Sequence, residues 1–156
     1  IFDQNKILKR HNFYIKPPQN YFSPRNIQIH GISWEDVKNK PTFDELYPTI
    51  DPILEEVDFL VAHNAPFDSS VMKATCGHYY RPLPSQKWFC TVQIARRLWP
   101  SLDNHKLPTI CKHLGIELDN HHDGLADAMA CAEIVIAAYE ESPNWMELMQ
   151  KKSSRG

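Results

Sequence analysis

Apolar and polar positions divide the chain into a first part suited to paired strands and a second part in which strands and helices alternate. Ile1-Phe2, the polar turn at 3–6 and the mostly apolar run 7–15 are typical of strand, turn and strand. Pro17-Pro18 ends the second strand, and residues 19–33, rich in Asn, Pro, Ser and Gly, indicate a connection.

Two helix starts follow this connection. Ser33 precedes an acidic turn and is a suitable N-cap. Thr42 has Glu45 three residues later, which is the pattern of a capping box. The helix that begins there carries Pro48 and Pro52, and these predict a kink or a break because proline lacks the backbone N–H.

The second part alternates between short apolar runs and helical patterns. The run 59–62 is continuously apolar, as expected for a strand buried on both faces, and 88–90 repeats the plan. Four helices are predicted in this part. The first begins near Pro66, the second runs from an N-cap at Thr91 to Leu98, the third runs from an N-cap at Asn104 to Gly115, and the fourth spans 125–139. Strands followed by strand–helix alternation predict one α/β domain with helices packed on a mixed sheet.

Composition narrows the classes of protein. The chain has 156 residues, with 17 Lys and Arg against 19 Asp and Glu, so its net charge of −2 excludes a strongly basic nucleic-acid wrapper but leaves room for a local basic patch. No apolar run approaches the ~18 residues of a membrane span, so no membrane partner is expected. The four cysteines form no Cys-x-x-Cys pair, and we interpret them as free, buried thiols of a cytoplasmic protein.

Two segments carry candidate chemistry. His63 to Asp68 places an acidic side chain in the first helical turn after a buried strand, where sites of α/β proteins cluster. His122 lies in a loop five positions before Asp127, and the helix has the small residues Ala126, Ala128 and Ala130 around that acid. Taken singly, each acid has a plainer explanation. Asp68 would be a helix-start carboxylate that complements the helix dipole, and Asp127 would be a surface acid of a helix with an unrelated histidine in the loop before it. His121, like two other histidines, reads as a surface or packing residue.

Together the two segments resemble the second and third motifs of the DEDD exonuclease superfamily, in the His-bearing branch that includes the epsilon subunit of bacterial DNA polymerase III. The motif His-Asn-Ala-x-Phe-Asp is met at 63–68, and a His followed by Asp after four residues is met at 122–127. The stretch 20–32, which ends in His-Gly-Ile, is similar to a third region of epsilon-like exonucleases. The resemblance covers most of residues 1–141 and leaves 142–156 as a C-terminal extension ending in a tail.

This resemblance implies a ribonuclease H-like mixed sheet flanked by helices. It also implies a 3′→5′ exonuclease that cleaves single-stranded DNA or RNA from the 3′ end with two Mg²⁺ or Mn²⁺ ions, and that has a DNA polymerase as a candidate partner. By the same resemblance, Asp68 and Asp127 bind the ions and His122 is the general base. The residues that would border the terminal nucleotide are His30, Gly31, Ile32, Asn64 and Phe67. For Phe67, the residue pattern itself favours packing in the core over this contact, since a first-turn Phe usually faces the sheet.

The family's first motif, Asp-x-Glu on the first central strand, is absent, because no Asp in the chain has Glu two positions later. We therefore expect that strand to lie upstream of Ile1, and the chain alone to be inactive or weak and prone to strand exchange or homo-oligomerisation. One alternative is a non-catalytic module of the same fold that binds nucleic acid or a polymerase. A third hypothesis, a metal-dependent hydrolase of another fold, predicts that Asp68 and Asp127 do not converge.

Overall fold

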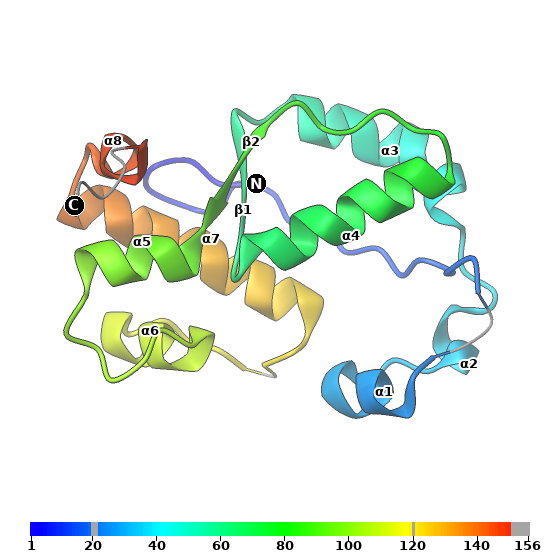
Figure 1. The fold of residues 1–156 in the computed structure, drawn as a ribbon, viewed down its shortest axis with the longest axis horizontal. Coiled ribbons are helices and arrows are strands. Elements are labelled where there is room, and N and C mark those ends of the chain that lie inside the picture. The colour runs from blue at the N-terminus through cyan, green and yellow to red at the C-terminus, as the bar shows by residue number, and fades with distance from the viewer. Residues whose placement is uncertain (20–21, 120, 151–156) are drawn as a thin grey trace, which may run out of the picture.

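The computed structural model describes residues 1–19, 22–119 and 121–150. Two strands lie in the middle of the molecule, with helices on both sides of them (Figure 1). In chain order the elements are α1 (Pro24–His30), α2 (Trp34–Val37), α3 (Phe43–Glu55), β1 (Phe59–Ala62), α4 (Ala65–His78), β2 (Lys87–Cys90), α5 (Thr91–Leu98), α6 (Leu107–Leu114), α7 (Gly124–Glu141) and α8 (Trp145–Gln150). The predicted α/β class is confirmed.

β1 and β2 form a parallel pair in which Phe59 lies beside Lys87 and Ala62 beside Cys90. Parallel neighbours need a crossover, and α4 supplies it by packing along both strands. The carboxyl ends of both strands therefore lie at the same edge of the sheet. This edge is where α4 and α5 begin, and it positions the candidate site.

The predicted strand over 7–15 is wrong. In the described residues this run makes one antiparallel bridge, between Phe2 and Ile7, and Lys16 makes a parallel bridge to Thr42. A strand persists only where a neighbour satisfies its backbone groups. Here Ile1 accepts from the N–H groups of Leu8 and Lys9, and beyond them no ladder continues.

The connection predicted over 19–33 contains a helix, α1. The sequence carried both of its boundary signals, since Pro24 is a favoured first helical residue and Gly31 follows the last one. Gly31 adopts the left-handed conformation, with a φ of 71°, and its N–H bonds to the Ile27 carbonyl. Residues 20 and 21 of this stretch lie outside the described residues.

Both predicted capping sites at α2 and α3 are confirmed, with Ser33 paired to Asp36 and Thr42 paired to Glu45. The break predicted in α3 does not occur, because the helix continues through Pro48 and Pro52. The two prolines are four residues apart, so the carbonyl left without a donor by Pro52 is that of Pro48. The packed face of α3, which includes Phe43 and Tyr47, holds the helix against α4.

Three other helix starts differ from the sequence prediction by one or two residues. Cys90, not Thr91, is the N-cap of α5, and Lys106, not Asn104, is the N-cap of α6. Asn104 nevertheless accepts hydrogen bonds from the Lys106 N–H and the Thr109 hydroxyl. α7 begins at Gly124, and the carboxylate of Asp123 caps it by accepting from the N–H groups of Leu125 and Ala126.

The main core gathers side chains from β2, α5, α6, α7 and α8. Trp145 of α8 is fully buried and its ring contacts Phe59, Phe89 and Tyr139. Residues just after the predicted boundary at 141 therefore pack against the same core as the helices before it. The boundary itself remains a prediction, and residues 151–156 lie outside the described residues.

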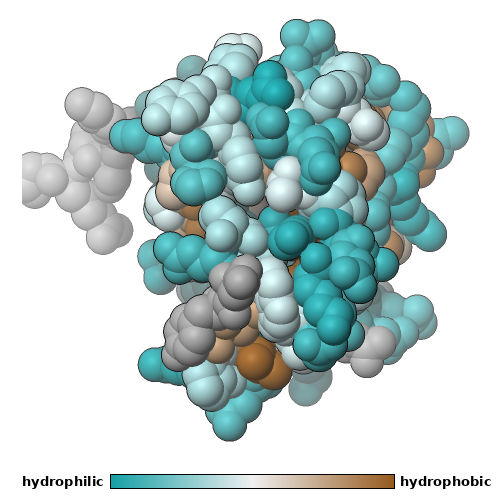
Figure 2. Space-filling model, turned by 90° about the vertical axis from the view of Figure 1, so that its right-hand side faces the viewer, coloured by the Kyte–Doolittle hydropathy of each residue, from teal (hydrophilic) through white to brown (hydrophobic). Residues whose placement is uncertain are grey.

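The face in Figure 2 is mostly hydrophilic, with apolar side chains in small separate places. Among the helices of the described residues, none combines the length and the apolar character that crossing a membrane requires.

Trp145→Ala is expected to destabilise the chain by about 3–5 kcal/mol, because it leaves a large cavity among three aromatic rings. Urea denaturation followed by circular dichroism measures the loss. Trp145→Phe, which keeps an apolar ring in place, should cost clearly less. A loss under about 1 kcal/mol for the alanine variant, the size expected at a surface position, would contradict this packing.

The expectation of free, buried thiols is confirmed for Cys76, Cys90, Cys111 and Cys131. Burial is the main cause that raises the pKa of Cys111 to about 11 and the pKa of Cys131 to about 12. At pH 8 these two thiols thus remain protonated, with roughly one thiolate in 10³ or fewer.

Iodoacetamide at pH 8 should therefore leave Cys111 and Cys131 unlabelled in the folded chain and modify both in urea, as measured by peptide mass spectrometry. Labelling of either thiol at the same rate with and without urea would show that it is not buried.

Candidate functional site

The candidate site begins where the two parallel strands end. His63 follows β1 directly, and Thr91, which is fully buried, follows β2. The Nδ1 atom of His63 lies 2.9 Å from the Thr91 hydroxyl, so a hydrogen bond joins the two strand ends. Burial lowers the pKa of His63, the negative charge of Asp127 opposes this shift, and His121 adds to it. His63 thus lies close to residues from the start of α7.

Asp68 lies in the first turn of α4 and is half-buried. Burial raises its pKa, while a hydrogen bond from its own backbone N–H opposes the shift. Within the described residues, no salt bridge involves Asp68. The carboxylate is thus partly removed from water without a cation beside it, a situation that a bound cation would relieve.

A tight turn before α7 presents the second acid. The Oδ1 atom of Asp127 accepts from His121 Nδ1 at 2.9 Å and from the His122 backbone N–H at 3.3 Å. The turn requires a φ of 82° at His122, and it stacks the two imidazoles with ring centroids 3.8 Å apart. Both hydrogen bonds use Oδ1, which leaves Oδ2 of Asp127 for a ligand.

His121 is exposed, as expected of a surface residue, and its ring also bonds the carboxylate of Asp127. The sequence signal was present: two adjacent histidines precede an acid that lies one turn into a helix. The other two histidines fit the packing interpretation, since His105 bonds the Trp99 carbonyl and His113 lies against the Trp99 ring.

Cys131 shows that the two acids lie in one region. It follows Asp127 by one turn on α7, and its buried thiol is close to Thr91 and to the backbone of His63. After burial, which is the largest cause, the negative charges of both Asp127 and Asp68 contribute to the raised pKa of this thiol. The two acids thus act on the same buried group from two helices, contrary to the hypothesis of another fold.

Phe67 and Asn64 lie beside Asp68 and both are exposed. Phe67 is 65% exposed, so the alternative of core packing is wrong. The buried side chain of this turn is that of Ala65. Asn64 adopts the left-handed conformation, with a φ of 63°, and its side chain makes no capping bond. Phe67 and Asp68 lie at a cleft of about 480 Å³, and its other walls include the apolar side chains of Phe43, Val71, Met72, Tyr79 and Trp88.

The His-Gly-Ile segment lies against the start of α7. The Nδ1 atom of His30 accepts from the Ile32 N–H at 3.0 Å, and Gly31 makes the bend between them. His30 and Ile32 line a cavity of about 240 Å³ together with Asp123 and Gly124. The structure therefore brings this segment to the same end of α7 as the His121-His122 turn.

The donor atoms fit a hard divalent cation. Asp68 and Asp127 offer carboxylate oxygens, which Mg²⁺ and Mn²⁺ prefer. Among the described residues, the ligand atoms of His121, His122 and Asp127 lie within 4.8 Å of one another. The histidine nitrogens are softer donors and one of them already bonds Asp127, so the carboxylates fit such a cation better than the histidines do.

Comparisons with known proteins agree with this geometry. The exonuclease model of the RNase_T family matches residues 1–135. The PolC-type DNA polymerase III of Clostridium perfringens is 34% identical over 81% of this chain, and the DNA polymerase III subunit epsilon of Escherichia coli is 31% identical over 85%. The chain spans 9% of the length of the first relative and 57% of the second.

Solved exonucleases share the fold. Exonuclease X, solved with 5′ overhanging duplex DNA, matches 83% of this chain and 72% of its own with a TM-score of 0.64 and 26% identity. The nuclease domain of 3′hExo, a DEDDh family member solved with rAMP, matches 83% and 71% with a TM-score of 0.71 and 20% identity. The predicted ribonuclease H-like fold and the resemblance to epsilon within the DEDD superfamily are confirmed. The chain belongs to the RNase_T family of exonucleases.

Proposed function

We propose that this domain is a 3′→5′ exonuclease that hydrolyses phosphodiester bonds at the 3′ end of single-stranded DNA or RNA. The observation that carries the proposal is the His121-His122 turn hydrogen-bonded to Asp127, beside Asp68 and the carboxyl ends of two parallel strands. Membership of an exonuclease family gives the reaction class. The relatives named DNA polymerase III make a polymerase the partner that we propose.

In this proposal Asp68 and Asp127 would be ligands of a site for two Mg²⁺ or Mn²⁺ ions, which the two carboxylates of the family's Asp-x-Glu motif would complete. Bound there, the ions would lower the pKa of a water molecule and stabilise the negative charge that develops on the phosphate. The half-buried carboxylate of Asp68 gains from a cation, because its charge is otherwise partly desolvated. The hydrogen bond from His121 holds the carboxylate of Asp127 in one orientation.

His122 takes the proton from the attacking water. Its backbone N–H is bound to Asp127, whereas no hydrogen bond within the described residues uses its ring nitrogens. The exposed ring is therefore available to a water molecule, and an imidazole is suited to accept a proton near neutral pH. The left-handed turn fixes where this ring projects relative to Asp127.

The residues around the acids would hold the terminal nucleotide. The exposed ring of Phe67 offers a stacking surface next to Asp68, and stacking on an aromatic ring contributes about 1–3 kcal/mol per base. The exposed amide of Asn64, which makes no capping bond, can hydrogen-bond a sugar or phosphate. His30 and Ile32 line a cavity with Asp123 and Gly124 at the start of the helix that carries Asp127, which supports a role of this segment in the same proposal.

The test uses the chain extended upstream of Ile1 and a 5′-labelled single-stranded oligonucleotide. With Mg²⁺ or Mn²⁺ we expect a ladder that shortens from the 3′ end, and EDTA should abolish it. The 156-residue chain alone should cleave weakly or not at all, because its sequence contains no Asp-x-Glu.

Shortening from the 5′ end, or cleavage that persists in EDTA, would contradict the proposal. Binding of the oligonucleotide without cleavage by the extended chain would favour the alternative of a non-catalytic module, for which the absent Asp-x-Glu is the supporting observation.

A further inference from the structure

Three side chains meet at the carboxyl ends of the two strands, and we call their meeting the strand-end contact: His63, Thr91 and Cys131. His63 follows β1, Thr91 begins α5 directly after β2, and Cys131 lies in α7. The Nδ1 atom of His63 lies 2.9 Å from the Thr91 hydroxyl, and the Cys131 thiol lies close to Thr91 and to the His63 backbone. The contact therefore joins both strands to the helix that carries Asp127.

The hydroxyl of Thr91 is the polar group at the centre of this contact. Among the Ser, Thr, Asn, Gln and charged side chains that the structure describes, that of Thr91 is the only buried one. A buried hydroxyl needs a hydrogen-bond partner, because it cannot reach water. Valine has nearly the same shape without this requirement, so packing alone does not explain a threonine here. The bond to His63 supplies the partner.

A short and stiff path leads from His63 to Asp68. Asn64 adopts the left-handed conformation, and the N–H of Phe67 bonds its carbonyl at 2.9 Å. Pro66, in the same turn, has a φ fixed by its ring. The place of Asp68 at the start of α4 therefore follows from the place of His63.

A second path leads from Thr91 to Asp127 through packing. Cys131 is buried beside Thr91 and lies one turn after Asp127 on α7, so both side chains project from the same face of that helix. α5 and α7 also pack against each other in the main core. A shift of Thr91 would therefore move the start of α7 and Asp127 with it.

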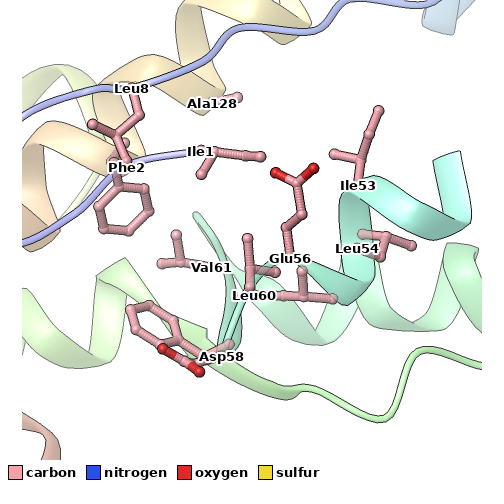
Figure 3. Close-up of a pocket in the computed structure, with 13 residues that line it drawn as sticks. Ile1, Phe2, Leu8, Ile53, Leu54, Glu56, Asp58, Leu60, Val61 and Ala128 are labelled. Carbon is pink, nitrogen blue, oxygen red and sulfur yellow. The ribbon is translucent and has the colours of Figure 1, made fainter. Parts of the chain in front are cut away.

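The other side of β1 borders a cavity of about 360 Å³, with Ile1 and Leu8 on one side of it and Leu60 and Val61 on the other (Figure 3). All four residues of β1 are only half-buried, so the expectation of a strand buried on both faces is wrong. We expect the strand upstream of Ile1 to pair on this side. The strand-end contact lies on the side of β2, so that strand would leave it in place.

We propose that His63 and Thr91 are positioning residues of the metal site. The inference rests on the proposed function, because it concerns ions that Asp68 and Asp127 would bind. The hydrogen bond between His63 and Thr91 holds the starts of α4 and α7 in one arrangement, so that both carboxylates face the same ions. His63 acts through Thr91 and does not bind the ions. Its Nδ1 is used by the hydroxyl, and among the described residues it lies outside the group of ligand atoms within 4.8 Å of one another around Asp127.

The test measures the Mn²⁺ affinity of the extended chain by electron paramagnetic resonance, which distinguishes free from bound ions. Thr91→Val removes the hydroxyl and keeps the shape of the side chain. We expect it to weaken binding about tenfold, the lower end of the effect of residues that orient metal ligands. Thr91→Ser keeps the hydroxyl and should keep the affinity.

Variants of the partner test the same bond from its other end. His63→Ala should weaken Mn²⁺ binding as much as Thr91→Val does. His63→Asn should restore most of the affinity, because its amide places a polar atom where Nδ1 lies. The double variant His63→Ala/Thr91→Val should bind no more weakly than either single variant, because both remove one and the same bond.

Val135→Ala is the control for lost stability. Val135 is fully buried on α7, about two turns beyond Asp127, so the variant leaves a cavity in the core without touching the strand-end contact. Its Mn²⁺ affinity should be unchanged under conditions in which circular dichroism shows the chain to be folded.

Unchanged affinity in Thr91→Val, together with weak binding by Asp127→Ala, would overturn this inference and leave the proposed function in place. An equal loss in Val135→Ala would also overturn it, because general destabilisation would then explain the effect. Equal affinity of Asp127→Ala and the unsubstituted chain would overturn both the inference and the metal assignment on which it rests. The Thr91 variants decide the matter even if His63→Ala does not fold.

Discussion

Asp127→Ala is expected to lower divalent-ion-dependent cleavage by the extended chain by at least about 10²-fold, the scale of losing one electrostatic contact to a reacting group. Two effects add to this loss. The variant removes a carboxylate that we assign to metal binding. It also removes the acceptor of the His121 and His122 hydrogen bonds that hold the turn before α7. Single-turnover cleavage of a labelled oligonucleotide at saturating Mg²⁺ measures the effect.

Asp123→Asn provides the matched control, because Asp123 caps the same helix through its Oδ1 and an asparagine can keep that bond. Its activity should stay within a few-fold of the unsubstituted chain. Undiminished cleavage by Asp127→Ala would refute the assignment of the site.

His122→Ala is expected to lower the rate constant of the chemical step by about 10²–10⁴-fold, since it removes the general base. Substrate affinity should change little, because the ring is exposed and the backbone bond to Asp127 remains possible. Added imidazole should restore part of the rate. Single-turnover rates at several substrate concentrations separate the two parameters.

His121→Ala distinguishes the neighbouring ring. We expect a smaller loss, about 10–100-fold, because His121 orients the carboxylate of Asp127 and does not touch the water. Imidazole should not rescue it. If both variants lost the same rate and imidazole rescued only His121→Ala, then His121 would be the general base and His122 the residue that orients Asp127.

Sequence patterns correctly predicted the parts of the fold that interactions between neighbouring residues determine. The capping boxes at Ser33 and Thr42 and the apolar run 59–62 each depend on neighbouring residues, and all three formed where predicted. The run 7–15 did not, because a strand depends on a distant neighbour that no local pattern supplies. α3 kept its helical path through two prolines because its packed face, contacts with α4 included, outweighs the lost bond.

In the candidate site, too, local patterns predicted some residues and missed the contacts that depend on the fold. The spacing of the motifs indicated Asp68 and Asp127, and the structure places both acids around Cys131. The contact of His121 with Asp127 depends on a left-handed turn at His122, which the sequence did not reveal. The core packing favoured for Phe67 was wrong, because either face of the first turn of α4 could meet the sheet, and Ala65 takes that position.

The most direct test of the central claim is a crystal structure of the extended chain with Mn²⁺, read by anomalous scattering. The account predicts manganese with carboxylate oxygens of both Asp68 and Asp127 among its ligands, at distances within about 2.5 Å. Manganese held by the histidines alone, or no manganese within reach of both carboxylates, would contradict it.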